Sequence, residues 1–230
     1  MKSPGDVLRG VQPPAFDHPC PRCGTRMARP GLCLDCEDAQ DRIRETKRET
    51  AASIPSRFGW ASSLQVPQLD ARVDPAALER ARGMDIRALD RVTLLGPAGA
   101  GKTSLAVAIA CAWTAVHTRA ALFLSAVDVG LARQQHGLGE GEARLARQAM
   151  NAPLLILDEL GGEVDFGIAA VAHVVQHRYD RRRPTIATSG RTVEELVSRY
   201  GAGVARRLLE TIGGVIVLKL RSHMDRSPVR

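Results

Sequence analysis

Short apolar runs alternate with longer amphipathic segments along the chain from Arg91 onward. The apolar runs are typical of buried strands, and they lie at residues 91–95, 119–126, 152–160, 184–189 and 214–220. Segments with helical periodicity separate and follow them, at residues 102–116, 127–137, 141–150, 166–180, 192–201 and 204–210. This alternation predicts an α/β fold in which a five-stranded parallel sheet is covered by helices on both faces.

The composition of the remaining sequence divides it into further stretches. Residues 1–17 contain proline and glycine without periodicity, which predicts a flexible arm, and residues 18–36 hold a cluster of cysteines. Residues 37–55 carry many charges of both signs, which predicts an exposed linker helix that ends at a proline. Residues 56–230 are expected to form the main domain, and a helix is expected directly after the cap Asp74.

The overall composition is that of a globular protein with excess positive charge. The 230 residues are 44% hydrophobic, enough for one domain with a core and a small appendage. The net charge of +7 favours a polyanionic partner, and with 3% aromatic residues we expect phosphate contacts to dominate any nucleic-acid binding. The sequence shows no apolar run of membrane-spanning length and no secretory signal, so we expect a cytoplasmic protein without a membrane partner.

A glycine-rich segment joins the strand 91–95 to the helix that follows it. It matches the pattern G-x-x-x-x-G-K-[ST], in which backbone N–H groups and the helix dipole face phosphate oxygens. Lys102 is then expected to reach the β- and γ-phosphates of ATP, and Thr103 to bind Mg²⁺. The alternative is a plain glycine turn. The predicted nucleotide-binding residues are Gly96, Pro97, Ala98, Gly99, Ala100, Gly101, Lys102, Thr103 and Ser104.

Two acidic residues, Asp158 and Glu159, stand near the end of the apolar run 152–160. In a parallel sheet this end of the strand faces the same edge as the glycine loop. We therefore expect Asp158 to hold Mg²⁺ and Glu159 to orient and polarise the attacking water. A pair of acids favours hydrolysis over phosphoryl transfer to a small acceptor. The alternative is a strand that simply ends in a polar turn before two glycines.

Two further pairs of residues are candidates for phosphate contacts. Thr188 and Ser189 end the strand 184–189, where a hydroxyl group can sense the γ-phosphate or position water. Arg206 and Arg207 lie on the predicted helix 204–210, and an arginine presented to a neighbouring subunit's γ-phosphate stabilises transition-state charge. The alternatives are a plain strand end and a solvated arginine pair on an amphipathic helix.

The cysteine cluster consists of two C-x₂-C pairs, Cys20 with Cys23 and Cys33 with Cys36. Four thiolates in this spacing predict a closed tetrahedral Zn²⁺ site, which is structural rather than catalytic. Because so short a segment cannot bury a core, metal binding would supply its folding free energy. The alternatives are four unpaired thiols, or His18 as a competing ligand.

Together these motifs resemble those of the AAA+ ATPases, in particular the DnaC/IstB-like group with its bacterial and phage helicase loaders. The resemblance spans residues 54–220 and is carried by the stretches IPSRF, GPAGAGKTSLAVAIA, LLILDELGG, TIATSGRTVEEL and RYGAGVARRLLE. It implies an AAA+ P-loop fold without a C-terminal helical lid, and an ATPase that assembles with further copies of itself. The last stretch is similar to the family's box VII, which makes Arg207 the arginine finger and Arg206 its neighbour.

The resemblance also implies a function. We expect an ATP-dependent replicative helicase loader, whose zinc module binds the helicase and whose ATPase assembly contacts single-stranded DNA. Alternatively, the zinc module binds DNA, through contacts of Arg22, Arg26 and Arg29 with phosphates. An IstB-like ATPase that regulates a transposase on target DNA is the alternative function. A small-molecule kinase is a third, and the tandem acids argue against it.

One position departs from the family pattern. Where the family has asparagine after Thr-Ser at sensor 1, this chain has Gly190, which offers no side chain to a phosphate. Either Thr188 or Ser189 substitutes for it, or phosphate sensing is weak. We therefore expect slow intrinsic ATP hydrolysis.

Overall fold

The structure is a computed structural model, and it describes residues 17–137, 140–209 and 214–219. Two predictions concern residues outside these ranges. One is the flexible arm, nearly all of which is not described, and the other is the lack of a C-terminal helical lid. The chain divides into two compact units, Met1–Arg44 and Glu45–Arg230, and helix α1, Leu34–Ser53, contributes residues to both. Each unit is therefore described separately.

The small unit is built around its cysteines. Strands β1, His18–Pro19, and β2, Arg26–Met27, form an antiparallel pair that is closed by a tight turn. The buried residues of this unit are three of the four clustered cysteines, with two apolar side chains packed against them: Cys20, Cys33 and Cys36, with Met27 and Leu32. So small an apolar core cannot stabilise a fold by hydrophobic burial alone.

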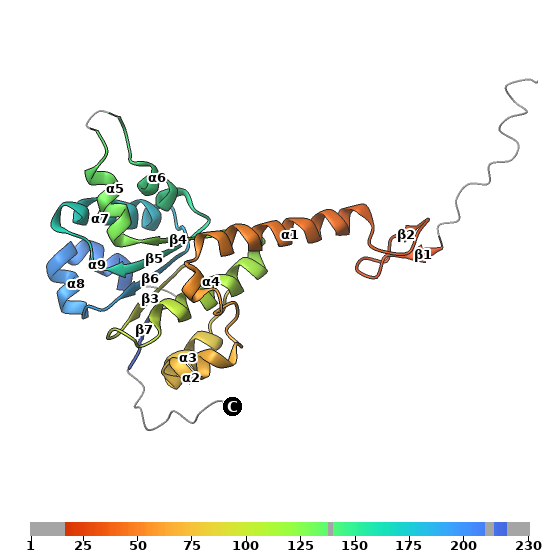
Figure 1. The fold of residues 1–230 in the computed structure, drawn as a ribbon, viewed down its shortest axis with the longest axis horizontal. Helices are drawn as coiled ribbons and strands as arrows, with labels where there is room; N and C mark the ends of the chain where they lie inside the picture. Colours follow the sequence, from red (N-terminus) through yellow and green to blue (C-terminus); the bar gives the residue numbers. More distant parts are fainter. Residues whose placement is uncertain (1–16, 138–139, 210–213, 220–230) are drawn as a thin grey trace, which may run out of the picture. The chain divides into compact units, whose positions relative to one another are not determined.

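The large unit is organised by one parallel sheet, shown in Figure 1. Its strands lie in the order β4-β5-β6-β3-β7 and all neighbours run parallel. The strands are β3 (Arg91–Leu95), β4 (Ala121–Ser125), β5 (Leu154–Leu160), β6 (Thr185–Ser189) and β7 (Val215–Val217). The predicted α/β fold with five parallel strands is confirmed. Every predicted strand is present, and the ends differ from the prediction by a few residues.

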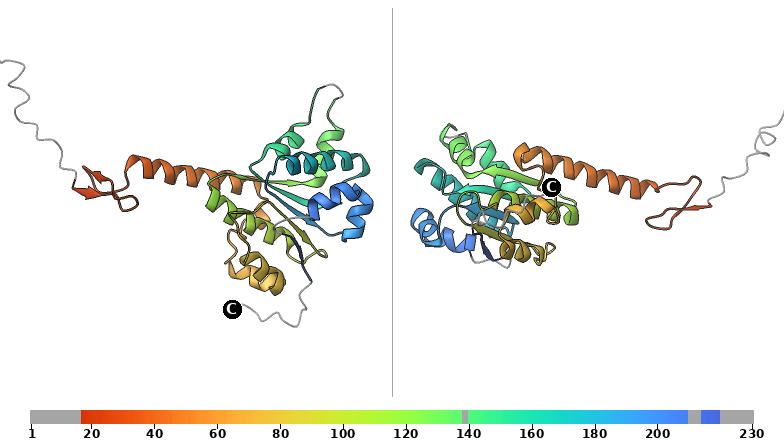
Figure 2. Two further views of the ribbon diagram at one scale, coloured as in Figure 1. Left: turned by 180° about the vertical axis from the view of Figure 1, so that it is seen from behind. Right: turned by 60° about the horizontal axis from the view of Figure 1, so that its bottom comes forward.

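Helices cover both faces of this sheet (Figures 1 and 2). One face packs against α2 (Pro67–Arg72), α3 (Pro75–Arg82) and α4 (Lys102–His117), with the short 3-10 turn η1 (Ser56–Phe58) beside them. The other face packs against α5 (Ala126–Gln134), α6 (Arg144–Asn151), α7 (Asp165–Asp180), α8 (Val193–Tyr200) and α9 (Ala202–Leu209). Among the described helices, none combines the length and apolar composition that a membrane span requires.

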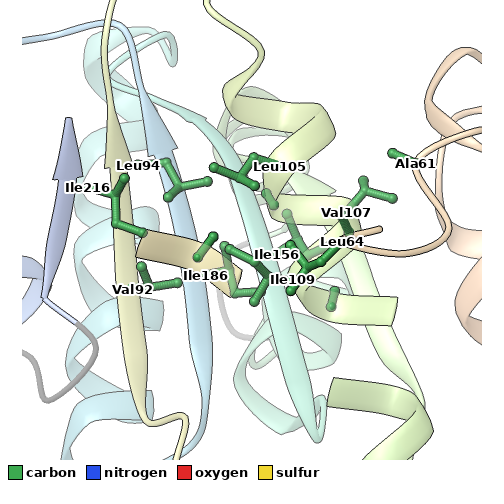
Figure 3. Packing of buried hydrophobic residues seen from close by; sticks show 14 of the residues in the cluster. Ala61, Leu64, Val92, Leu94, Leu105, Val107, Ile109, Ile156, Ile186 and Ile216 are labelled. Atoms are coloured by element: carbon green, nitrogen blue, oxygen red, sulfur yellow. The ribbon is translucent and has the colours of Figure 1, made fainter. Parts of the chain in front are cut away.

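Strand β5 explains why its sequence is a continuous apolar run. Its side chains alternate between the two faces, so that Leu154 and Ile156 enter one core, whereas Leu155 and Leu157 enter the other. Figure 3 shows the first core, where strand side chains such as Ile156 meet α4. Burial of one such side chain contributes roughly 1.5–3 kcal/mol, so both helical layers are held to the sheet by the hydrophobic effect.

The second half of α1 belongs to the large unit and covers the edge strand β4 (Figure 1). The Thr50 hydroxyl accepts a hydrogen bond from the N–H of Ala121 at 3.0 Å, and the Ser53 hydroxyl accepts one from the N–H of Phe123 at 3.1 Å. These side chains satisfy backbone groups that an edge strand otherwise leaves open to another chain. The sequence predicted an exposed linker helix here, whereas Thr50 is buried because its hydroxyl is bonded to the edge strand β4.

Arg178, near the end of α7, is a buried cation that packs against the start of β6. Its side chain is 1% exposed, and its guanidinium donates to the carbonyls of Ala149 at 2.7 Å and Ala152 at 2.9 Å, to the carbonyl of Pro184, and to the hydroxyl of Thr185 at 2.9 Å. Burial lowers the pKa of Arg178 to about 9, which leaves it charged at neutral pH. One side chain thus joins the end of α6 to the start of β6.

We expect Arg178→Met to lower the free energy of unfolding by about 3 kcal/mol or more, because several buried carbonyls lose their donor and each unsatisfied group costs roughly 1–3 kcal/mol. Denaturant unfolding followed by circular dichroism checks this. Arg181→Met, at an exposed position three residues further on, is the matched control and should change stability by less than about 0.5 kcal/mol. Equal stability of the two variants would contradict the role assigned to Arg178.

Candidate nucleotide-binding and metal sites

The glycine loop connects β3 to α4 and requires glycine for two reasons. Gly99 and Gly101 adopt left-handed backbone angles, with φ of +80° and +87°. A Cβ atom on Gly101 would lie 2.8 Å from a methyl carbon of Val73, so a side chain is also excluded by space. Gly101 precedes α4 and caps it without a side chain, which leaves the first N–H groups of the helix for an anion.

Lys102 is the first residue of α4, and its side chain folds back over the loop. Its Nζ donates hydrogen bonds to the carbonyls of Gly96 and Pro97, both at 2.8 Å. Burial lowers the pKa of Lys102, and the negative charges of Asp158 and Glu159 act in the opposite direction. The ammonium group therefore lies inside the loop, where its charge faces the position expected for phosphates.

Asp158 gathers hydroxyl groups from two other elements around one oxygen. Thr103 Oγ1, on α4, donates to Asp158 Oδ1 at 3.0 Å, and Thr188 Oγ1, on β6, donates to the same oxygen at 2.6 Å. The carboxylate is 3% exposed. A carboxylate and a threonine hydroxyl in direct contact are the oxygen ligands that Mg²⁺ prefers, so the residues present fit this ion.

Glu159 has an unusual backbone conformation that directs it out of the strand. Its φ is +59°, a left-handed value that costs a non-glycine residue roughly 1–3 kcal/mol. The pairing of β5 with β6 shifts between Leu157 and Leu160, so Glu159 falls in an irregularity of the sheet and its side chain is exposed. Its N–H donates to Thr188 Oγ1 at 3.1 Å. The bulge thus presents a second carboxylate at the edge that carries the glycine loop.

The two sensor 1 candidates differ in what their hydroxyl groups contact. Thr188 lies between Asp158 and Glu159, as just described. Ser189 is buried, and its hydroxyl donates to the carbonyl of Leu160 at 2.6 Å while accepting the N–H of Arg191 at 3.1 Å. The structure therefore brings Thr188, but not Ser189, into contact with the acidic pair.

Gly190 leaves open space beside the glycine loop. It is exposed, and a Cβ atom built on it would have the carbonyl oxygen of Gly96 at 3.9 Å as its neighbour. A longer side chain at this position has room, so the glycine is not imposed by packing. The asparagine that the resemblance implies is therefore missing from a position with space for it.

Arg207 lies away from the glycine loop of its own chain. Its guanidinium lies over the ring of Tyr179 at 5.2 Å, and Arg91 lies over the same ring at 4.6 Å. Arg91 begins β3, whereas the glycine loop follows the other end of that strand, roughly 13 Å away at about 3.3 Å per residue. Arg207 Nη1 also donates to the carbonyl of Gly203 at 2.7 Å, and Arg206 is exposed.

The four clustered cysteines have the geometry of a metal site. The sulfur atoms of Cys20, Cys23, Cys33 and Cys36 all lie within 4.8 Å of one another. A tetrahedral Zn²⁺ with bonds of about 2.3 Å places its sulfurs about 3.8 Å apart, so the cluster fits the ion closely. The N–H of Cys33 donates to Cys20 Sγ at 3.5 Å, and this contact is the largest of several that lower the pKa of Cys20 to about 6. The neighbouring thiol of Cys33, followed by burial, raises the pKa of Cys36 to about 12.

Glu163, a buried acid close to the site, was not among the residues predicted from the sequence. It is 3% exposed and lies four residues after Glu159, directly beyond a pair of glycines. Acidic residues in loops are usually exposed, so its residue type gave no reason to expect burial. Its position directly after the two glycines was the one feature of the sequence that could have drawn attention to it.

Known proteins are similar to this chain in sequence or in fold. A family model described as IstB-like ATP binding protein matches residues 33–212. Among solved structures, the DnaC helicase loader is similar with a TM-score of 0.58 and 23% identity, over 72% of this chain and 100% of that chain. DnaI is similar with a TM-score of 0.54 and 20% identity, over 73% and 95% of the two chains.

A third similar structure is the replication initiator DnaA bound to AMPPCP and single-stranded DNA. Its TM-score is 0.53 and its identity 18%, over 69% of this chain and 50% of that chain. The comparison with curated proteins found no match. At these identities the solved structures show a shared fold, while the family model spans well over half of the chain, including the glycine loop, both acids and helix α9. The chain therefore belongs to the family of IstB-like ATP-binding proteins, an AAA+ ATPase family.

Proposed function

We propose that this protein is an ATP-dependent loader of a replicative DNA helicase, acting in the cytoplasm. The observation that carries the proposal is the cluster formed by Lys102, Thr103, Asp158, Glu159 and Thr188 at one edge of the sheet. This cluster joins a phosphate loop, a candidate Mg²⁺ site and a projecting carboxylate. The similarity to the DnaC helicase loader supports loading as the work that the nucleotide drives.

Each residue of the cluster has a proposed role in ATP hydrolysis. Lys102 exchanges its two carbonyl partners for phosphate oxygens, and the N–H groups at the start of α4 bind the same phosphates. Thr103 and Asp158 would hold Mg²⁺, which would supply neutralisation of phosphate charge. Glu159 accepts a hydrogen bond from the attacking water and polarises it. Thr188 is the proposed sensor, because its hydroxyl contacts Asp158 and the N–H of Glu159, whereas the hydroxyl of Ser189 contacts the main chain of Leu160 and Arg191.

Arg207 supports a site that is completed by a second copy of the chain. The glycine loop and Arg207 lie at opposite ends of β3, so Arg207 does not reach the nucleotide of its own subunit. In an oligomer it would instead meet the γ-phosphate bound by a neighbour. To do so it must leave the ring of Tyr179, which helps to account for the slow hydrolysis expected of the isolated chain.

The two compact units suggest a division of the loading work. We propose that the zinc module, residues 18–36, binds the helicase, and that the oligomer of ATPase domains contacts single-stranded DNA. The similarity to DnaA, whose structure was solved with single-stranded DNA, supports the second part. The net charge of +7 is consistent with a phosphate-dominated contact.

Removal of zinc is expected to unfold residues 18–36 and to leave ATP binding intact, because the cysteines are the buried residues of their own unit. Metal analysis should find one zinc per chain, lost in Cys23→Ser and retained in Cys111→Ser, whose thiol lies outside the cluster. Limited proteolysis and titration with a fluorescent ATP analogue after chelation check the two halves of this prediction. Melting of the whole protein by the chelator would contradict it.

Arg207→Ala is expected to bind ATP normally and to lose hydrolysis only in the assembled protein, by roughly 10³–10⁵-fold for an arginine finger. Arg206→Ala, the exposed neighbour, is the matched control and should hydrolyse ATP at the normal rate. Nucleotide titration of the monomer and ATPase assays of the oligomer measure both quantities. If Arg207→Ala weakens nucleotide binding by the monomer, the finger assignment is wrong.

The loader function is tested by capture of the host's purified replicative helicase on the immobilised full chain, with and without ATP. We expect retention that depends on the zinc module and is lost in Cys23→Ser, because that variant lacks the fourth ligand. The same assay with a transposase in place of the helicase tests the IstB-like alternative. Retention of the transposase alone would replace the loader function with that alternative.

A further inference from the structure

We propose that Glu163, Arg199 and Tyr200 form a buried clamp that positions Glu159 for hydrolysis. This inference rests on the proposed function, in that Glu159 is taken as the residue that polarises water. The clamp lies behind the loop that follows Glu159 and involves none of the residues that the phosphate or metal would contact. Its members are therefore positioning residues.

The clamp satisfies a fully buried carboxylate. The Glu163 side chain has no exposed surface. Its Oε1 accepts hydrogen bonds from the hydroxyl of Tyr200 at 2.6 Å and from Nε of Arg199 at 3.0 Å. Its Oε2 accepts the N–H of Gly161 at 3.0 Å, and Arg199 Nη2 donates in addition to the carbonyl of Glu163. Both oxygens and the main chain of Glu163 are therefore held.

The charges of the clamp favour this arrangement over its alternatives. Burial, and next the hydrogen bond to Glu163, raise the pKa of Tyr200, so its hydroxyl keeps the proton that it donates. Burial alone would lower the pKa of Arg199, but its hydrogen bond and attraction to Glu163 raise it overall. Burial of a charge costs several kcal/mol before its contacts are counted, and the hydrogen bonds from Arg199, Tyr200 and Gly161 offset this cost for Glu163.

The loop between Glu159 and Glu163 carries the effect of the clamp to the active site. The N–H of Gly161 is shared by Glu163 and by the hydroxyl of Tyr200 at 2.9 Å, and its carbonyl accepts from Nε of Arg191 at 2.9 Å. The N–H of Gly162 donates to the carbonyl of Glu159 itself at 2.9 Å. The peptide groups after Glu159 are thus tied down one after another.

This fixation accounts for the strained backbone of Glu159. A left-handed φ of +59° persists only when the surroundings over-determine it. Thr188 holds the N–H of Glu159 from one side, and the clamp holds the following turn from the other. Loosening the clamp leaves the nucleotide loop untouched but lets Glu159 relax toward ordinary backbone angles and move its carboxylate.

The clamp also connects the site to the helix that carries the proposed finger. Arg199 and Tyr200 are the last two residues of α8, and Gly201 alone separates them from α9 with Arg207. A displacement of α9 by a neighbouring subunit therefore acts directly on the residues that hold the loop after Glu159. The position of Glu159 is in this way linked to assembly.

The test uses Tyr200→Phe, which removes one hydroxyl and keeps the buried ring. We expect kcat for ATP to fall by about 10–100-fold, as for a small misplacement of a catalytic group, with nucleotide affinity unchanged within about twofold. Glu163→Gln and Arg199→Lys should likewise lower kcat and leave nucleotide affinity unchanged. In the double variant of Tyr200→Phe with Glu163→Gln, the loss in log kcat should be smaller than the sum of the losses in the two single variants. Single-turnover hydrolysis and nucleotide titration of the full chain measure the two quantities.

Thr192→Ala is the matched control for stability. It removes the N-cap of α8, whose hydroxyl accepts the N–H of Glu195, at a cost of roughly 1 kcal/mol, and it lies at the opposite end of this helix from Arg199 and Tyr200. We expect it to lower the melting temperature without changing kcat well below that temperature. If Tyr200→Phe retains the normal kcat, or if kcat follows melting temperature equally in both variants, the clamp is merely structural and the inference is overturned.

Glu159→Gln separates failure of the inference from failure of the proposed function. It should bind ATP and lose hydrolysis. Normal hydrolysis by Glu159→Gln would overturn the role of Glu159 and the clamp with it. Loss of hydrolysis in Glu159→Gln together with a normal kcat in Tyr200→Phe would overturn the clamp alone.

Discussion

The geometry of the candidate site depends on one carboxylate oxygen, Asp158 Oδ1, which accepts two hydroxyl hydrogen bonds from different elements. Thr103 brings the start of α4 to it and Thr188 brings the end of β6, so that the glycine loop, β5 and β6 share one fixed point. Because the carboxylate is buried, its charge needs these donors, or a cation that replaces one of them. The bulge at Glu159 is joined to the same point, because the N–H of Glu159 donates to Thr188 Oγ1.

Much of the fold and the residues of this edge were predictable because both follow from local sequence rules. Apolar runs of strand length alternate with helical segments, and parallel strands bring their carboxyl ends to one edge, so the parallel arrangement places Asp158 at the same edge as Thr103. The left-handed backbone of Glu159 was not predictable. It arises from the shifted pairing of β5 with β6, a tertiary feature that leaves no mark in the residues LLILDEL.

The functional and structural residues that sequence patterns did not reveal are polar groups with distant partners. Arg178 is satisfied by carbonyls from the end of α6 and the start of β6, and Glu163 by the end of α8. Composition and periodicity assign such charges to the surface, since isolated charges are costly inside a protein. Only the fold supplies their donors and acceptors. The same holds for Thr50, which lies in a highly charged helix yet serves the edge of β4.

The distribution of positive charge supports the proposal that this nucleotide site is half of a larger one. Within the subunit, Lys102 places a cation in the glycine loop, and Gly190 contributes no polar side chain. Arg207 lies over the ring of Tyr179, near the end of β3 that is distant from the loop. Charge that develops on the γ-phosphate would thus be only partly neutralised by one chain. In the proposed oligomer a neighbouring copy would supply a further cation from α9. The short connection from α9 through Gly201 to the proposed clamp on Glu163 would link the same contact to Glu159. Hydrolysis that waits for both changes would be coupled to assembly by the fold itself.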